Sequence, residues 1–548
     1  MVDYPWFKSY DPGVPHSLMP YPDITVLDVL AEADKNRPDK ALSIYQGREV
    51  SNREVEEHSN ALAQALIASG VKKGDRVICL FLNCPQSHIA FFAIWKAGGI
   101  VVPLNPLYTP FELERGITTV DAEVAIIHST WYPTIKGLQP KTRLRTIIAT
   151  DLDSYAVKPV KEEGDSVKLE QGDLWWADLL DKYKGASRPD VKVTKEDTAL
   201  ILYSGGTTGV PKGVMTTHNA IIITANQHLA WYRLMLEQGD RVLGVLPLFH
   251  AFGVYVAFGF CLLYHNPQVL ILNPRDIKSV VDTIRDFQIA SMAATPALYI
   301  AILNYAGRKP DDLRSLKLMS SGAAPLLTET KQELEKLIDG IVIEGFGMTE
   351  TAIAGASTPV KGKWKQGSTG LPLPDVIMRI VDIETGEKDL PAGEPGELII
   401  SAPNLMRGYW NRPEETAESL RNGWLYTGDV GYMDEDGYLF LTSRKKDLIK
   451  VGGFQVWPRE VEEVIAMHPA VAEVAVAGIP DPRQGEAVKA WIVLKNGSKI
   501  TTDEIHNFTR EKLTGYKVPR FYEFRQDLPK TLVGKVLRRV LQEEEAKK

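Results

Sequence analysis

Cysteine is scarce in this chain, and its scarcity argues against two classes of protein. The 548 residues contain three cysteines, Cys79, Cys84 and Cys261. Three cysteines cannot form the disulfide framework of a small secreted domain, and their spacing does not match a zinc site. We therefore expect them to be core residues of a protein in a reducing, cytoplasmic compartment.

Positive charge is not in excess, and the first residues lack the pattern of a signal peptide. The 70 Asp and Glu residues outnumber the 63 Lys and Arg residues, which gives a net charge of −7. A mild acidic excess argues against a nucleic-acid-binding surface. The N-terminal segment is rich in proline and aromatic residues and has neither a basic start nor an apolar core. We therefore expect no signal peptide.

One uncharged run, residues 242–264, is long enough to cross a bilayer. Pro247, His250 and three glycines interrupt it, and it lacks the basic flanks that orient a single span. We favour a buried strand, a turn and a helix over a membrane span. A non-catalytic lipid- or membrane-binding scaffold remains the alternative from a different class, and peripheral membrane contact is compatible with the sequence.

The length and the texture of the chain predict more than one domain. A chain of 548 residues is too long for one hydrophobic core. Strand and helix patterns alternate in the first third of the chain, as in a parallel sheet, and short strands with turn residues after Gly370 predict a small β-barrel-like unit. The last hundred residues resemble a separate module. We predict an α/β plus α+β protein, with a large domain of parallel-sheet α/β subdomains at 1–445 and a small α+β domain at 446–548.

Helix starts are marked by capping residues. Thr25 precedes an amphipathic pattern, Ser51 and Glu54 match a capping box, and so do Thr501 and Glu504. We expect helices to begin at these positions.

A glycine- and threonine-rich loop, YSGGTTGVPKGVMTTH at 203–218, follows an apolar run. Its glycines let backbone N–H groups turn towards an anion, and its threonine hydroxyls and lysine add further donors. A phosphate cradle and an ordinary turn both fit this composition. A P-loop does not fit, because Lys212 follows Val210 and Pro211, and Gly213 replaces the Ser or Thr that holds magnesium. No G-x-G-x-x-G motif opens a helix here, which argues against a dinucleotide fold.

The loop and six further segments, in order, resemble the adenylate-forming superfamily of acyl-CoA synthetases, aryl-CoA ligases, firefly-type luciferases and peptide-synthetase adenylation domains. The six are LPLFHAFG (246–253), SSGAAPL (320–326), GFGMTET (345–351), NGWLYTGD (422–429), SRKKDLIKVGGFQVWPREVE (443–462) and PKTLVGKVLRR (529–539). The chain departs from the family at Gly205, where many members have serine, and at Phe346, where tyrosine is common.

The resemblance implies a nucleotide site of phosphate, adenine and ribose contacts. The residues concerned are Ser204, Gly205, Gly206, Thr207, Thr208, Gly209 and Lys212 for phosphate, Gly322, Ala323, Ala324, Gly345, Phe346 and Gly347 for adenine, and Asp429 and Arg444 for ribose or phosphate. An ionised Asp suits two adjacent ribose hydroxyls because its oxygens only accept hydrogen bonds. A flat Phe between two glycines suits an adenine ring. The rival interpretations are a turn aspartate and a core phenylalanine.

The resemblance also implies catalytic roles. Thr349 would contact phosphate, Glu350 would bind Mg²⁺, and Lys535 would reach the α-phosphate and the substrate carboxylate. His250 would form a gate between nucleotide and acyl site. A helix-capping pair, a surface lysine and a core histidine are the corresponding structural alternatives.

The segment from Lys446 onward would serve the second half-reaction. By resemblance, Lys446 is the hinge of a mobile C-terminal domain, and Lys450 acts in thioester formation. Gly452, Gly453 and Phe454 would let the backbone approach the pantetheine arm of coenzyme A.

These resemblances predict an AMP-forming acid–thiol ligase that uses ATP, Mg²⁺ and coenzyme A. The segment 422–458 most resembles fatty-acyl-CoA synthetases, and the 242–264 segment suits an alkyl tunnel. An aryl-acid, coumarate-like CoA ligase is the alternative, and a luciferase-like oxygenase shares the first half-reaction. The absence of a carrier-protein domain argues against a peptide synthetase. Chain length, pathway and oligomeric state are left open, a homodimer included.

Overall fold

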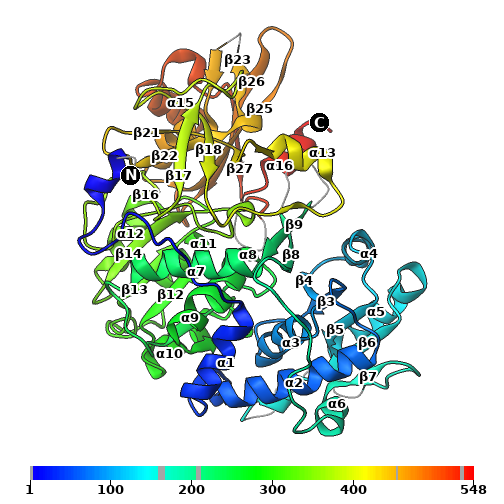
Figure 1. Ribbon diagram of the computed structural model, residues 1–548. Coiled ribbons are helices and arrows are strands. Elements are labelled where there is room, and N and C mark those ends of the chain that lie inside the picture. Colours follow the sequence, from blue (N-terminus) through cyan, green and yellow to red (C-terminus); the bar gives the residue numbers. More distant parts are fainter. Residues whose placement is uncertain (1–3, 158–166, 205–211, 452–453, 531–535, 548) are drawn as a thin grey trace.

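The computed structural model describes residues 4–157, 167–204, 212–451, 454–530 and 536–547 (Figure 1). Within these ranges the strands form four sheets, two large and two small. The orange and red C-terminal elements lie at one end of the molecule in Figure 1, and the blue N-terminal sheet lies at the other. The α/β plus α+β class predicted from the sequence is confirmed.

The first large sheet carries the strand that leads into the glycine-rich loop. Its eight described strands run in the order β19-β9-β8-β4-β3-β5-β6-β7. The pairs from β8 to β7 are parallel, while β9 and β19 add antiparallel strands at the edge. The bounds are β3 Arg76–Leu80, β4 Ile100–Pro103, β5 Val124–His128, β6 Thr146–Thr150, β7 Leu174–Trp175, β8 Thr198–Ser204, β9 Lys212–Thr217 and β19 Gly408–Tyr409.

The second large sheet joins strands from distant parts of the chain. Its described order is β16-β15-β14-β13-β12-β10-β11-β1-β2. Strand β1 pairs in parallel with β11, so Ser43 lies opposite Gln268. The bounds are β1 Ala41–Tyr45, β2 Arg48–Ser51, β10 Val242–Gly244, β11 Gln268–Leu270, β12 Ser291–Ala294, β13 Leu318–Ser321, β14 Ile341–Phe346, β15 Ala356–Ser357 and β16 Leu371–Pro372.

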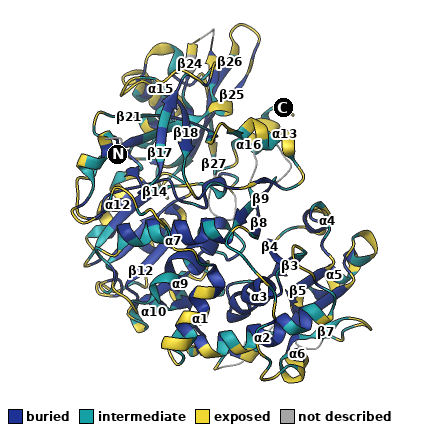
Figure 2. Ribbon diagram, viewed as in Figure 1, coloured by how far each residue is buried: buried dark blue, intermediate teal, exposed yellow. Residues whose placement is uncertain are grey.

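Helices cover both large sheets, and one of them is buried on all sides. Every residue of α3 (Pro85–Lys96) is buried, and Figure 2 shows it in dark blue. A helix that is apolar all round belongs in the interior of a large protein. The other α-helices up to the second small sheet are α1 Val26–Asn36, α2 Asn52–Ala68, α4 Pro110–Thr119, α5 Tyr132–Leu138, α6 Trp176–Lys182, α7 His218–Tyr232, α8 Ala251–Val254, α9 Leu262–Tyr264, α10 Ile277–Asp286, α11 Pro296–Leu303, α12 Thr328–Glu335 and α13 Pro413–Ser419.

The predicted helix starts are confirmed, with one difference in detail. Helices begin after Thr25 and Thr501 as expected; Thr501 forms its predicted capping box, and Thr25 forms one with Asp28 that was not predicted. Ser51 caps α2 by accepting from the N–H of Glu54. The Glu54 carboxylate does not complete the box, because it pairs with Arg48 at 2.7 Å.

The 242–264 run forms the strand, turn and helix predicted for it. Strand β10 is followed by a loop and then by α8, a π-helical stretch Tyr255–Cys261 and α9. In the part of the chain that the structure describes, we find no helix with the length and apolar character of a membrane span.

The two small sheets match the short strands predicted after Gly370 and the separate module predicted for the last hundred residues. The first is antiparallel, with β17 Ile377–Val381, β18 Gly396–Ser401, β20 Leu420–Arg421, β21 Trp424–Met433 and β22 Leu439–Arg444; the described pairings do not close it into a ring. The second contains β23 Ile449–Val451, β24 Phe454–Val456, β25 Val471–Asp481, β26 Gly485–Leu494 and β27 Phe521–Arg525, beside α14 Pro458–Ala466, α15 Thr502–Arg510 and α16 Arg538–Glu545. Residues of this last part pack into hydrophobic clusters of their own.

Candidate active site

The predicted phosphate loop connects two paired strands. Ser204 ends β8 and Lys212 begins β9, and the two residues are direct partners in the antiparallel ladder. The segment between them, with Gly205, Gly206, Thr207, Thr208 and Gly209, lies outside the described residues. The described ends of the loop are therefore held next to each other at one edge of the first large sheet.

The predicted adenine and magnesium residues from Gly345 to Glu350 lie at the end of β14 and in the tight turn that follows it. Gly345 and Phe346 end β14 and pair with β15, and Thr349 and Glu350 lie in a 3₁₀ turn, η6 (Thr349–Thr351). A Cβ at Gly347 would overlap the carbonyl oxygen of Ile353. Glu350 is buried while Phe346 and Thr349 are half-buried. Glycine at 347 is thus required by the turn that brings the acid inward.

One tyrosine that the sequence analysis missed connects Lys212 to Glu350. The Tyr409 hydroxyl donates to Glu350 Oε1 at 3.0 Å, and Lys212 Nζ lies 4.7 Å from the centre of the Tyr409 ring. Burial raises the pKa of Tyr409, and the nearby Glu350 charge raises it further, while Arg444 lowers it. The phenol is therefore a donor at neutral pH, and Tyr409 contacts both Lys212 and Glu350.

The predicted ribose residues form an ion pair. Arg444 Nε lies 2.7 Å from Asp429 Oδ1, and the two residues are opposite each other on β21 and β22. Asp429 is buried, whereas about a third of the Arg444 side chain is exposed. Lys446 follows in the 3₁₀ turn η7 (Lys445–Asp447), where burial lowers its pKa and Asp447 opposes that shift.

The predicted gate lies beyond β10, opposite the loop after β13. His250 Nδ1 accepts from the N–H of Phe252 at 3.2 Å, so the neutral ring carries its proton on Nε2. Burial lowers the pKa of His250 to about 4. The Phe252 ring packs so close to Gly322 that a Cβ there would lie 3.0 Å from it. Of the neighbouring loop residues, Ala323 is exposed with a positive φ of 66° and Ala324 is half-buried.

Two asparagines support these loops and were not identified from the sequence. Asn83 Nδ2 donates to the carbonyl oxygens of Gly244 and Leu246, at 3.0 and 2.9 Å. Asn404 Nδ2 donates to the Thr351 carbonyl oxygen at 2.6 Å, next to Glu350. No local sequence pattern marks either residue, because each bond joins segments far apart in the chain.

Part of the predicted site is not brought together. Lys450 is exposed on β23, and Phe454 is exposed and stacks on Tyr516 at 4.7 Å. Within the described residues, no hydrogen bond or ion pair joins Lys450 to the surroundings of Glu350. Gly452, Gly453 and Lys535 lie outside the described residues. Their roles stay predictions.

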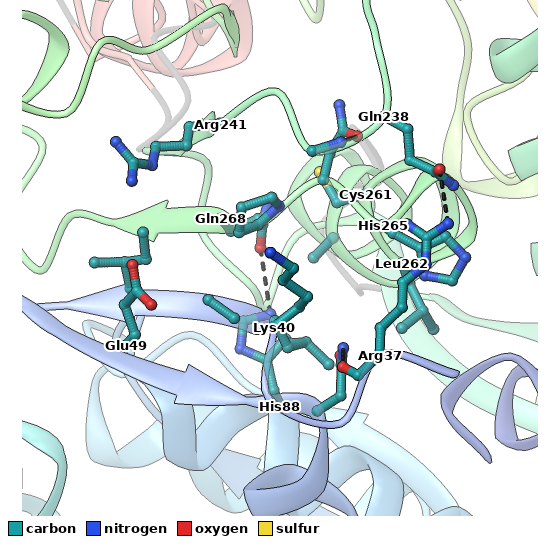
Figure 3. Close-up of a pocket in the computed structure, with 18 of the residues that line it drawn as sticks. Arg37, Lys40, Glu49, His88, Gln238, Arg241, Cys261, Leu262, His265 and Gln268 are labelled. Atoms are coloured by element: carbon teal, nitrogen blue, oxygen red, sulfur yellow. Dashed lines mark hydrogen bonds between the residues drawn. The ribbon is translucent and has the colours of Figure 1, made fainter. Parts of the chain in front are cut away.

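A cavity of about 500 Å³ lies elsewhere (Figure 3). It is lined by residues near the C-terminal end of α1, by β1, α3 and the π-helical stretch, and by the segments that precede β10 and β11; none of the predicted site residues lines it. Its labelled His88 Nε2 meets Gln268 Oε1 at 3.2 Å, and burial lowers the pKa of His88 to about 4. The second half of the 242–264 run therefore borders a cavity, but at the opposite ends of β10 and β11 from His250.

The described side chains suit a magnesium nucleotide. Glu350 Oε1 is held by Tyr409, and none of the described residues donates a hydrogen bond to Oε2. Mg²⁺ in nucleotide sites usually takes one or two protein carboxylates, with waters and phosphates as its other ligands. Within the described ranges no three His, Cys, Asp or Glu side chains gather as a metal cluster. A single carboxylate therefore fits a cation carried with ATP better than a dedicated protein cage.

The loops concerned follow the carboxyl ends of parallel strands, where open α/β sheets bind ligands. Strands β8, β10, β13 and β14 each end at one of them. The arrangement brings β9, which begins at the described end of the predicted phosphate loop, next to the turn that carries buried Glu350, while the ion-paired Asp429 lies on β21.

Two family models match this chain. The AMP-binding enzyme model matches residues 30–410, and the AMP-binding enzyme C-terminal domain model matches residues 460–535. A Bacillus subtilis (strain 168) protein named long-chain-fatty-acid–CoA ligase is 37% identical over 553 residues, which cover 99% of this chain and 98% of the relative. Solanum tuberosum 4-coumarate–CoA ligase 1 is 32% identical, with 89% and 87% covered.

A solved structure supports the same grouping. ATP-bound MatB from Rhodopseudomonas palustris superposes with a TM-score of 0.83 at 29% identity, covering 95% of this chain and 99% of MatB. Fold, family models and full-length relatives agree. The chain belongs to the AMP-binding enzymes, the adenylate-forming superfamily that its motifs resemble.

Proposed function

We propose that the protein is an ATP-dependent fatty acid–CoA ligase acting on medium- to long-chain acids. It converts a carboxylic acid, ATP and coenzyme A into acyl-CoA, AMP and pyrophosphate. The observation that carries the proposal is the placement of Lys212 and buried Glu350 on the two groups of one tyrosine, Tyr409, together with the Asp429–Arg444 ion pair of β21 and β22. The names of full-length relatives support the acid class.

The reaction has two steps, adenylation and thioester formation. A carboxylate oxygen of the acid attacks the α-phosphorus of ATP, and the bond to pyrophosphate breaks. The thiolate sulfur of coenzyme A then attacks the acyl carbon, and AMP leaves with the electron pair of the carbon–oxygen bond. Mg²⁺ bound to ATP supplies charge neutralisation. Lys535 brings the two anions of the first step together, and Asp429 and Arg444 hold the ribose.

We propose a domain boundary at Lys446, with a nucleotide domain at 1–445 and a mobile domain at 446–548. Lys446 lies in a short turn between β22 and β23, where the two small sheets meet. Rotation about this turn would exchange the face that carries Lys535 for the face that carries Lys450, Gly452, Gly453 and Phe454. The exposure of Lys450 and Phe454 supports a face that is unused in the first step.

An assay of pyrophosphate release tests the substrate class. We expect release with acids of 8 to 18 carbons, and acyl-CoA formation when coenzyme A is added. The alternative is an aryl-acid CoA ligase, which the 4-coumarate–CoA ligase relative favours. A clear preference for hydroxycinnamates over alkyl acids would overturn the fatty-acid assignment. Failure to bind ATP, or function retained in Lys535→Ala, would favour the scaffold alternative.

Location and assembly are further proposals. We propose a cytoplasmic location, supported by three buried cysteines that form no disulfide. A homodimer and a peripheral membrane contact are tested by light scattering and by flotation with phospholipid vesicles.

A further inference from the structure

Tyr409 occupies a position between two groups that the proposed reaction uses. Its hydroxyl donates to Glu350 Oε1 at 3.0 Å, and its ring faces Lys212 Nζ at 4.7 Å from the ring centre. Tyr409 and Glu350 are both buried, at 7% exposure each. An ammonium within about 6 Å of a ring centre is attracted by the negative face of the ring. One side chain therefore contacts both the acid and the lysine at the end of the phosphate loop.

The backbone fixes Tyr409 on both sides. Strand β19 pairs with β9, so that Tyr409 lies opposite Val214. On its two sides, the N–H of Trp410 donates to the Gly213 carbonyl oxygen at 2.7 Å, and the N–H of Met406 donates to the Glu350 carbonyl oxygen at 2.8 Å. The tyrosine is thus tied to the strand that follows the phosphate loop and to the turn that carries the acid. It cannot leave one without disturbing the other.

The hydrogen bond between Tyr409 and Glu350 orients the carboxylate. The phenol O–H donates and Glu350 Oε1 accepts, at 3.0 Å. Because Oε1 is engaged and no described residue donates to Oε2, the carboxylate presents one particular oxygen to a cation.

We propose that Tyr409 is a positioning residue for adenylation, which holds Glu350 for the nucleotide-bound cation and Lys212 for the phosphates. This inference rests on the proposed ligase function. The hydroxyl orients the Glu350 carboxylate, and the ring attracts the Lys212 ammonium. Substitutions that remove the hydroxyl and the ring separately therefore have different effects.

The test uses ATP–pyrophosphate exchange at fixed ATP and varied Mg²⁺. Tyr409→Phe removes the hydroxyl and keeps the ring, so we expect the Mg²⁺ concentration for half-maximal exchange to rise about tenfold. The KM for ATP at saturating Mg²⁺ is expected to change less than twofold. Tyr409→Leu also removes the ring, and we expect it to raise the KM for ATP as well. A role in packing alone would lower activity equally at all Mg²⁺ concentrations.

The control is Tyr438→Phe. Tyr438 is buried, donates to the Lys363 carbonyl oxygen at 2.6 Å, and has Lys365 Nζ 4.3 Å from its ring centre. Like Tyr409, it combines a donated hydrogen bond with a lysine over its ring, but its acceptor is a backbone carbonyl oxygen and it lies outside the proposed site. We expect its Mg²⁺ dependence to equal that of the wild type.

A double-mutant comparison covers the case in which single variants also lose stability. If Tyr409 acts through Glu350, the double variant Tyr409→Phe/Glu350→Gln should need no more Mg²⁺ than Glu350→Gln alone. Additive losses, or an unchanged Mg²⁺ dependence in Tyr409→Phe, would overturn the positioning role. Wild-type protein without exchange activity for any acid would instead overturn the proposed function.

Discussion

Replacing Asp429 by Asn tests whether the Asp429 carboxylate binds ribose or only stabilises a turn. The carboxylate is buried and paired with Arg444, whose side chain is about a third exposed. Partly exposed pairs contribute up to about 1 kcal/mol, so the stability loss should be small. A hydrogen bond to a charged group contributes about 1.5 to 3 kcal/mol, which corresponds to a loss of roughly 10- to 150-fold in kcat/KM for ATP.

The assay is ATP–pyrophosphate exchange with ATP, 2′-deoxy-ATP and 3′-deoxy-ATP, beside thermal unfolding. We expect the wild type to prefer ATP over both deoxy analogues and Asp429→Asn to lose that preference. The matched control is Glu397→Gln, a buried acid that pairs with half-exposed Lys445 at 2.8 Å. Asp429→Asn with kcat/KM for ATP within threefold of the wild type, and with its nucleotide preference intact, would refute the ribose role.

Three further outcomes are expected. Lys535→Ala should lower adenylation by about two to three orders of magnitude and spare thioester formation from supplied acyl-adenylate, and Lys450→Ala should do the reverse; equal losses in both steps would contradict the two-face mechanism. Gly347→Ala should lower both ATP affinity and the unfolding temperature, because its Cβ overlaps a carbonyl oxygen. Gly137→Ala, in helix α5 with open space around it, should leave ATP affinity unchanged and should not lower the unfolding temperature. Burial lowers the pKa of Lys96 from 10.5 to about 8. Between about pH 8 and pH 10.5 the lysine is protonated in the unfolded chain and neutral in the folded protein, so the free energy of unfolding rises with pH. Relative to Lys96→Met, the wild type should gain about 2 kcal/mol of unfolding free energy between pH 7.5 and 9.5 in urea denaturation, and a flat difference would contradict the shift.

Local features of this fold could be predicted because they depend on residues close in sequence. Thr25 and Thr501 cap their helices through residues three positions later, and the strand ending at Ser204 is marked by a continuous apolar run. The sequence predicts a complete capping box at Ser51, but only the bond from the Glu54 N–H to the Ser51 hydroxyl forms. Arg48 competes for the Glu54 carboxylate, and that competitor became visible only when β2 and α2 were placed together.

Contacts between distant segments could not be predicted in the same way. Tyr409 and Glu350 are 59 residues apart, and Asn83 bonds carbonyl groups more than 160 residues away. Neither pairing has a periodicity or a turn signal. The roles of individual site residues came from resemblance to a family, and the geometry adds which of them touch.

The pairing of β1 with β11 has a consequence for the synthesis of the chain. About 225 residues separate Ser43 from its partner Gln268. At typical rates of about 5 to 20 residues per second, roughly 11 to 45 s pass before β1 can find its neighbour. During that interval an apolar strand near the N-terminus has no parallel partner, and an unpaired strand edge invites association with other chains. Recovery of native protein should therefore depend on temperature and on chaperones during expression more than its final stability suggests.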